Sequence, residues 1–388
     1  MSLGIDSFLS NPPEELQRKR WGLLSNQASV DRFGNYSKDL LQGKFKNNLK
    51  CLFSPQHGFW GTEQDNMMET PDVPDPGTGL PIYSLYSHTR RPTKQMMETI
   101  EVLLIDLQDV GTRIYTFITT LAYCLQEARK QGKEIVVLDR PNPIGGTVVE
   151  GNVLNPAWTS FVGVHPMPMR YGLTMGELAG LFNQEMDIRA ELKVIPMEGW
   201  HRSRYFDQNN SPWIMPSPNM PGLSTALVYP GQVLWEGTNV SEGRGTTRPF
   251  EVFGAPFINP REVKDYLKDI SLPGVRLIEI AFRPTFQKWQ GEECRGFFLW
   301  VFDRQVFKPY FTSLTLLQAV QTLYKDAFQW KTPPYEYETR RLPINLLIGD
   351  QEIRQALEKG QSVTELEDSW MVGVNDFLKL RQKYLLYP

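Results

Sequence analysis

The sequence contains few of the residues that build metal centres and disulfide frameworks. Its 388 residues include three cysteines, Cys51, Cys124 and Cys294, and four histidines. The cysteines lie far apart and form no CxxC motif, and neither an HExxH motif nor two histidines at metal-ligand spacing occur. We therefore expect neither a disulfide framework nor a tightly bound metal, and we expect the three cysteines to be packing residues.

An excess of one charge and a long apolar run are also lacking. Lys and Arg number 41 against 44 Asp and Glu, a formal net charge of −3 that argues against a generally basic surface for nucleic acid. No run of about 18 apolar residues is present, so no membrane span is expected. Residues 1–6 lack the features of a signal peptide, which fits a cytoplasmic protein or a chain that begins at the processed start of an exported one.

Motifs of nucleotide and serine-hydrolase chemistry are absent as well. No GxGxxG motif follows an apolar segment and no GxxxxGK[ST] motif occurs, so a nucleotide cofactor is not indicated. No GxSxG motif occurs, which argues against the nucleophile of an α/β-hydrolase. What the sequence does contain is 12% aromatic residues and 29 prolines, a composition typical of rigid loops around an organic ligand such as a carbohydrate.

The first two thirds of the chain alternate short apolar segments with helical patterns. Continuous apolar segments indicate strands buried on both faces, as in a parallel sheet. Residues 115–131 predict an amphipathic helix that ends at Gly132, and Thr174 with Glu177 predicts a capping box for a second helix. This succession predicts a Rossmann-like α/β domain with a mostly parallel sheet. Its strands are expected near residues 21–25, 50–54, 101–105, 134–138 and 191–196.

A proline-dense segment, residues 212–221, breaks this pattern. The length suits about two domains, and we place their boundary just after that segment, with an α/β domain at 1–228 and a smaller α+β domain at 229–388. The later patterns predict two strands and two helices, at 275–281, 296–302, 311–326 and 351–357.

Two loop-like segments carry most of the candidate chemistry. Residues 235–251 combine three glycines with two arginines and three glutamates, and no strand or helix period organises them. Glycine lets a backbone approach a ligand closely, although a solvated surface loop with salt bridges fits the pattern equally well. Residues 53–65 place His57 and Glu63 after a predicted strand, where functional side chains of parallel sheets gather; the alternative is a strand-to-helix turn with buried rings. Asp109 also follows a strand, and Arg113 could pair with it.

Nine runs in order along nearly the whole chain resemble the exo-β-N-acetylmuramidases, glycoside hydrolase family 171, formerly a bacterial domain of unknown function. They are LLSNQASV (23–30), FSPQHGFWG (53–61), LIDLQDVGTRIYTFITTL (104–121), VLDRPNPIGG (137–146), PMRYGLTMGELA (168–179), PSPNMP (216–221), VLWEGTNVSEGRGTTRPFEVFGAP (233–256), FRPTFQKWQGEECRGFFLWV (282–301) and PPYEYE (333–338). The resemblance implies an active site in the cleft between the two domains. It implies hydrolysis of terminal β-1,4-linked N-acetylmuramic acid from the non-reducing end of peptidoglycan fragments, no cofactor, and a monomer or homodimer that serves bacterial cell-wall recycling. The family is mostly exported.

One position departs from the family pattern. Where the family usually has Pro-Glu-His-Gly, with the glutamate as the favoured acid/base, this chain has Pro55-Gln56-His57-Gly58. Glutamine cannot transfer a proton near neutral pH, and losing a general acid typically costs about 10²–10⁴ in rate. Either Glu63, Glu242 or Glu236 supplies the acid, or the protein is a non-catalytic or altered-specificity relative that binds amino sugars of peptidoglycan. A phosphate or nucleotide enzyme that uses residues 243–245 is a weaker alternative.

Glycoside hydrolysis requires one group that protonates the leaving oxygen and a second that acts as nucleophile or base, or that orients the acetamido group of the substrate. We predict the catalytic residues to be Glu242 and Glu236, supported by Glu63, His57 and Asp109, and we expect at least four of these five to line one pocket. The predicted substrate-binding residues are Gln56, Asn26, Arg113, Asn142, Asn239, Arg244, Arg248 and Asn219. The two arginines of the 235–251 segment are expected to bind the lactyl carboxylate of muramic acid, unless they pair with Glu242 or Glu251.

Overall fold

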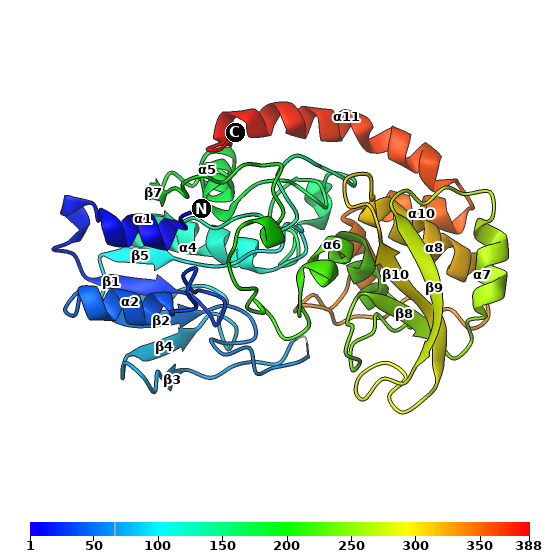
Figure 1. The fold of residues 1–388 in the computed structure, drawn as a ribbon, viewed down its shortest axis with the longest axis horizontal. Coiled ribbons are helices and arrows are strands. Elements are labelled where there is room, and N and C mark those ends of the chain that lie inside the picture. Colours follow the sequence, from blue (N-terminus) through cyan, green and yellow to red (C-terminus); the bar gives the residue numbers. More distant parts are fainter. Residues whose placement is uncertain (66) are drawn as a thin grey trace.

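The computed structural model describes residues 1–65 and 67–388 and contains two sheets, side by side in Figure 1. The larger has seven strands, and all neighbours in it pair in parallel except β3, which runs antiparallel to β4 at one edge. Across the sheet the strands are β3 (Val73–Pro74), β4 (Pro81–Ser84), β2 (Leu49–Ser54), β1 (Trp21–Leu24), β5 (Val102–Ile105), β6 (Glu134–Leu138) and β7 (Glu191–Ile195). All five predicted strands are present, so the predicted mostly parallel α/β fold is confirmed.

Helices cover both faces of the large sheet, which explains why its central strands are apolar throughout. Successive residues of β1 enter different cores: Leu23 packs in the core that contains Phe8 of α1 and Leu41 of α2, and Leu24 packs in the core of α3, α4 and α5. The helices of this part are α1 (Gly4–Ser10), α2 (Ser37–Lys44), α3 (Lys94–Met97), α4 (Phe117–Gln131) and α5 (Met175–Glu185), with short 3₁₀ helices η1 (Glu14–Leu16), η2 (Pro156–Trp158) and η3 (Phe206–Gln208).

The two helices predicted in this part form, with the predicted C-terminal end of α4 and the predicted N-terminal cap of α5, although α4 begins at Phe117 and not at residue 115. Gly132 follows α4 in the left-handed region with φ of 61°, which a glycine adopts without strain. Thr174 caps α5: its hydroxyl accepts a hydrogen bond from the Glu177 backbone N–H, and the Glu177 carboxylate accepts one from the Thr174 backbone N–H, as a capping box requires. Strands β3 and β4 were not predicted. For β3 the reason is its length of only two residues, both of which are exposed. All three cysteines are buried, as predicted.

The second sheet is antiparallel and forms an α+β unit with the C-terminal helices, as predicted. Its order is β8 (Val252–Ala255), β10 (Cys294–Val301) and β9 (Val275–Phe282). The helices of this part are α6 (Leu223–Gln232), α7 (Pro260–Leu267), α8 (Pro309–Leu323), α9 (Pro343–Ile348), α10 (Gln351–Glu358) and α11 (Val363–Arg381), with 3₁₀ helices η4 (Val233–Gly237) and η5 (Gln382–Tyr384). The predicted boundary at 228/229 falls inside α6, so that helix continues from one predicted domain into the other.

Two further segments join the halves of the molecule. The proline-dense segment crosses the carboxyl end of β1, where the Pro216 carbonyl accepts a hydrogen bond from Asn26 at 2.9 Å. Helix α11, which was not predicted, runs back over the molecule to the large sheet (Figure 1), and its last residue, Arg381, donates to the carbonyl oxygens of Gly146 and Gly172 at 3.1 Å. Among the residues that the structure describes, none forms a helix long and apolar enough to cross a membrane.

Candidate active site

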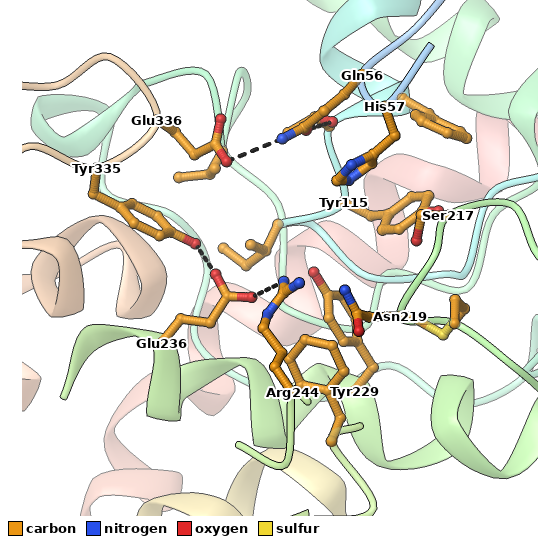
Figure 2. A pocket seen from close by; sticks show the side chains of 16 residues that line it. Gln56, His57, Tyr115, Ser217, Asn219, Tyr229, Glu236, Arg244, Tyr335 and Glu336 are labelled. Carbon is orange, nitrogen blue, oxygen red and sulfur yellow. Dashed lines mark hydrogen bonds and ion pairs between the residues drawn. The ribbon is translucent and has the colours of Figure 1, made fainter. Parts of the chain in front are cut away.

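A pocket lies where the two halves of the chain meet, and its free interior is a narrow cavity of about 40 Å³. Its walls come from the loop after β2, the turn before α4, the proline-dense segment, α6, η4, the loop before β8 and a turn near residue 336 (Figure 2). The lining residues are Gln56, His57, Ile114, Tyr115, Thr116, Phe117, Val162, Ser217, Asn219, Met220, Tyr229, Glu236, Arg244, Phe250, Tyr335 and Glu336.

His57 follows β2 and faces the pocket as a neutral imidazole. Burial, together with the nearby charge of Arg244, lowers the pKa of His57 to about 4. Its Nδ1 lies 2.7 Å from the carbonyl oxygen of Glu63. Because a carbonyl can only accept, Nδ1 carries the hydrogen and Nε2 is left as an acceptor. His57 has a positive φ of 71°, a conformation that is uncommon for residues other than glycine and is found at functional sites.

A tight turn carries Glu336 into the pocket. Tyr335 and Glu338 exchange two backbone hydrogen bonds of 2.9 Å, and the two residues between them, Glu336 and Tyr337, have φ of 45° and 67°. A type I′ turn requires positive φ at both central positions and normally contains Asn-Gly. Holding other residues there costs about 1–3 kcal/mol each. The guanidinium of Arg90 lies 3.0 Å from the centre of the Tyr337 ring and helps to keep Tyr337 in this conformation.

Glu336 is surrounded by neutral donors. Tyr86 donates to its Oε2 at 2.6 Å, and Gln56 donates from Nε2 to its Oε1 at 3.1 Å. Thr116 in turn donates to the Gln56 oxygen at 2.5 Å, which fixes the orientation of the amide. Burial raises the pKa of Glu336 to about 7, and the bonds from Tyr86 and Gln56 offset only part of that increase. The carboxyl therefore holds a proton at neutral pH in a substantial fraction of molecules.

Glu236 lies on the opposite wall in a positively charged environment (Figure 2). Its Oε1 is 2.7 Å from Nη2 of Arg244, and its Oε2 accepts a hydrogen bond of 2.5 Å from the Tyr335 hydroxyl. Burial alone would raise the pKa of Glu236, but the charge of Arg244 and the bond from Tyr335 outweigh burial and lower it. Glu236 is therefore ionised where Glu336 is still protonated.

This pair has the arrangement that acid–base chemistry requires. Two carboxyl groups whose surroundings move their pKa values in opposite directions divide into a proton donor and an anion. Tyr335 and Glu336 are neighbours in sequence, so a single turn supplies both the donor that holds Glu236 and the second carboxyl group. In the part of the chain that the structure describes, no three His, Cys, Asp or Glu side chains form a group that could hold a metal ion.

The expectation that four of the five predicted catalytic residues line one pocket is wrong, because only His57 and Glu236 do so among the described residues. Glu63 contributes its backbone carbonyl to His57, while its carboxylate interacts with Thr62. Asp109 bonds to the hydroxyl of Tyr171, and burial raises its pKa to about 6. Glu242 is held by Lys288 at 2.7 Å and by Nε of Arg244 at 3.2 Å, behind the pocket wall.

Of the predicted substrate-binding residues, Gln56, Asn219 and Arg244 line the pocket and the others lie elsewhere. Four of those others direct their side-chain donors to backbone carbonyl oxygens, which explains why a strand-end position did not bring them into the site: Asn26, Arg113, Asn142 and Asn239. Arg248 lies on the surface, where it pairs with Glu251 at 3.0 Å, the internal pairing that was the alternative for this residue.

Sequence reasoning did not select several pocket residues, among them Glu336, Tyr335, Tyr229, Tyr115 and Ser217. The segment PPYEYE carried the only signal for the first two, since four aromatic or acidic residues follow two prolines there, and such proline-led segments are usually turns. Tyr229 is a buried apolar-face residue of α6, which a sequence cannot distinguish from core.

Comparison with known proteins gives consistent matches over the full chain. Two family models match, "Exo-beta-N-acetylmuramidase NamZ, N-terminal" over residues 21–224 and "Exo-beta-N-acetylmuramidase NamZ, C-terminal" over residues 227–387. The peptidoglycan beta-N-acetylmuramidase NamZ of Bacillus subtilis (strain 168) is 42% identical over 384 residues, which cover 99% of this chain and 91% of that protein. Two DUF1343 family proteins of Bacteroides fragilis NCTC 9343 have similar crystal structures. One has a TM-score of 0.89 and 33% identity, covering 100% of this chain and 99% of the other; the second has 0.76 and 28%, covering 100% and 98%.

Proposed function

The chain belongs to the exo-β-N-acetylmuramidase family, and from this premise we propose that it is a glycosidase. It releases terminal β-1,4-linked N-acetylmuramic acid from the non-reducing end of peptidoglycan fragments, without a cofactor. The observation that carries the catalytic part of the proposal is the pair of buried carboxyl groups, Glu336 with its pKa raised to about 7 and Glu236 with its pKa lowered. The pair lines one pocket together with polar and aromatic side chains.

In this proposal Glu336 is the general acid. It transfers its proton to the glycosidic oxygen as the bond from that oxygen to the anomeric carbon breaks, so the remaining glycan leaves as a neutral alcohol. Glu336 is left as a carboxylate and recovers its proton from the water molecule whose oxygen ends on the anomeric carbon. Positive charge develops on the sugar ring in the transition state, and the Glu236 anion stabilises it there.

As a fixed anion, Glu236 is also suited to orient the acetamido group of the substrate. The acetamido oxygen can attack the anomeric carbon, in which case a nearby carboxylate orients the amide N–H. Arg244 and Tyr335 hold Glu236 ionised and fixed, at 2.7 Å and 2.5 Å. This preorganisation is what makes a charged group effective when charge develops in a dry site.

We propose that Gln56 positions the acid. The family's glutamate at this place could carry a proton, whereas the amide of Gln56 is permanently neutral. Its Nε2 donates to Glu336 and its oxygen accepts from Thr116, so it fixes the carboxyl without competing for the proton. The role that we expected from Glu63, Glu242 or Glu236 is in this proposal assigned to Glu336.

The remaining polar groups of the pocket suit a sugar with hydroxyl and amide groups. The bare Nε2 of His57 accepts a hydrogen bond from a sugar hydroxyl, and Ser217 and Asn219 supply further partners. The rings of Tyr115 and Tyr229 provide surface for the C–H faces of the ring. We propose that the charge of Arg244 attracts the lactyl carboxylate in addition to holding Glu236.

The test is hydrolysis of a chromogenic 2-acetamido-2-deoxyglucoside with and without the 3-O-lactyl group. We expect turnover of the muramic acid derivative, with free N-acetylmuramic acid as product, and much slower turnover of the glucosaminide. Binding of the muramic acid derivative without release of the chromophore would overturn the glycosidase proposal. We propose in addition that residues 1–228 and 229–388 act as two domains and that the protein is a monomer or homodimer with no nucleic-acid partner; light scattering checks the oligomeric state.

A further inference from the structure

One face of the three-stranded sheet carries large apolar side chains in contact with solvent. In the antiparallel register, Phe298 of β10 lies opposite Ile278 of β9, and Trp300 lies opposite Arg276, so these four side chains share a face. Phe302 follows β10 on the same side. Ile278 is 43% exposed, Trp300 46% and Phe302 53%, whereas the other face of the sheet packs on α7, where Val263 and Leu267 are buried. We call this surface the outer sheet face: Arg248, Arg276, Ile278, Phe298, Trp300 and Phe302.

Arginines stack on the aromatic rings of this face. The guanidinium of Arg276 lies 5.9 Å from the ring centre of Trp300 and 5.5 Å from that of Phe302. The guanidinium of Arg248 lies 5.1 Å from the ring centre of Phe298. Arg248 also pairs with Glu251 at 3.0 Å, so the positive charge of the face comes mainly from Arg276. The outer sheet face therefore combines flat apolar rings with positive charge.

This combination fits a glycan that carries carboxylates. Pyranose rings present apolar C–H faces that lie flat on aromatic rings. Peptidoglycan carries carboxylates on its stem peptides, and on those lactyl groups to which no peptide is joined. Exposed apolar patches of this kind mark binding surfaces, and opposite charge adds to the attraction when the partner approaches. A partner with carboxylates and sugar rings together matches both properties of the face.

The outer sheet face is also continuous with the active-site loop. Arg244 lines the pocket and Arg248 belongs to the face, and four residues of chain span at most about 14 Å. We infer that the outer sheet face is a second binding site for the peptidoglycan glycan strand, which holds the polymer whose terminal sugar occupies the pocket. This inference rests on the proposed muramidase activity.

The second site has a direct consequence for substrate length. A pocket for one terminal sugar binds short and long strands equally, because it contacts only their ends. A strand that also contacts the outer sheet face keeps its end near the pocket after each release, since the second contact raises the effective concentration of that end. The enzyme should therefore favour polymeric peptidoglycan over a small muramic acid glycoside.

The experiment measures co-sedimentation of the full chain with purified peptidoglycan sacculi. It also measures kcat/KM on sacculi whose stem peptides an amidase has removed, and on the chromogenic muramic acid glycoside. The test variants are Trp300→Ala and Arg276→Ala. The control is Phe33→Ala, because Phe33 is 74% exposed and carries a stacked arginine, Arg32, at 4.7 Å, but lies on a loop far along the chain from this sheet. We expect the dissociation constant for sacculi to rise about tenfold or more in Trp300→Ala and to stay unchanged in Phe33→Ala. The ratio of kcat/KM on sacculi to kcat/KM on the small glycoside should fall by a similar factor.

Two results would overturn the inference. The first is unchanged sedimentation with sacculi in both test variants. The second is a concentration-dependent dimer of the wild type that Trp300→Ala dissociates, which would make the face a contact between two copies. Turnover of the small glycoside by the wild type is independent of this face, so failure of the proposed activity would be recognised separately.

Discussion

The amide of Gln56 donates a hydrogen bond of 3.1 Å to the carboxyl of Glu336, although 280 residues separate them in sequence. The position at which this chain departs from its family is thus in direct contact with the carboxyl group that we propose as the acid. Because of this contact, replacing Gln56 with the glutamate of the family should change the pKa of the proposed acid.

Gln56→Glu should place two carboxyl groups in contact, and such groups share a proton because both cannot ionise at this distance. We expect the pKa that governs the loss of kcat at high pH to rise by about one unit, with kcat at pH 6 changed by less than about threefold. The measurement is kcat against pH for both proteins. An increase of tenfold or more at pH 6 would mean that the natural chain lacks its acid.

Glu336→Gln should remove the proton donor while keeping the size of the side chain and its contacts with Tyr86 and Gln56. Loss of a general acid lowers kcat by about 10²–10⁴ and leaves KM nearly unchanged. A substrate whose leaving group needs no proton should recover most of the rate. Glu63→Gln is the matched control, since the Glu63 carboxylate interacts with Thr62 outside the pocket. Equal losses in the two variants would contradict the assignment.

The wild-type enzyme should lose kcat as pH rises through about 7, because a general acid acts in its protonated form and the pKa of Glu336 is raised to about 7. Tyr86→Phe removes a hydrogen bond that lowers this pKa. We therefore expect the fall in kcat to shift to higher pH in Tyr86→Phe. A shift to lower pH would show that another group sets the profile.

Arg244→Ala should reduce kcat/KM on substrates with and without the lactyl group, because Arg244 holds Glu236 ionised at 2.7 Å. The muramic acid substrate should lose about 10–100-fold more, the worth of a charge-assisted hydrogen bond to its carboxylate. Steady-state kinetics on the substrate pair measure the difference. If both substrates lose the same factor, the arginine acts through Glu236 and the loop, and does not bind the lactyl group.

Lys288→Met should destabilise the loop behind the pocket. Lys288 donates to Glu242 at 2.7 Å and to the carbonyl oxygens of Trp235 and Val240 at 2.7 and 3.0 Å. Removing one partner of a buried ion pair costs about 3–5 kcal/mol of unfolding free energy, and Arg244, 3.2 Å from Glu242, offsets part of that cost here. Lys264→Met breaks an exposed pair with Glu279 and should cost less than about 1 kcal/mol. Urea unfolding compares them, and equal costs would contradict the proposed difference in burial.

The sheet could be predicted from the sequence and half of the site could not. Buried strands such as 102–105 are continuous apolar runs, and a capping box such as Thr174 with Glu177 is a local pattern. Asp109 has the strand-end position of a catalytic residue, yet its carboxylate meets the hydroxyl of Tyr171, 62 residues away, in the interior. No local pattern encodes that contact.

Glu336, in contrast, is the proposed acid but has no feature in the sequence that indicates such a role. Its turn has positive φ at two positions without glycine, a conformation that the sequence does not indicate. Contacts with Tyr86 and Gln56, 250 and 280 residues away, help to keep Glu336 in place. The loop at 235–251 was identified by composition, but the structure buries Glu236, Glu242 and Arg244 together in place of the solvated ion pairs of the alternative interpretation.

Helix α11 has a consequence for how the protein is made. The residues that follow it pack beside the large sheet: the Tyr387 hydroxyl donates to Asp139, after β6, at 2.5 Å, and the Pro388 carbonyl accepts from the backbone N–H of Arg202, after β7, at 2.9 Å. Tyr387 also belongs to the core that covers one face of the large sheet. When every strand of that sheet has been synthesised, Tyr387, which completes its core, has still to be added. The first half of the protein therefore completes its core only with residues from far along the chain, and loss of Tyr387 exposes part of that interior.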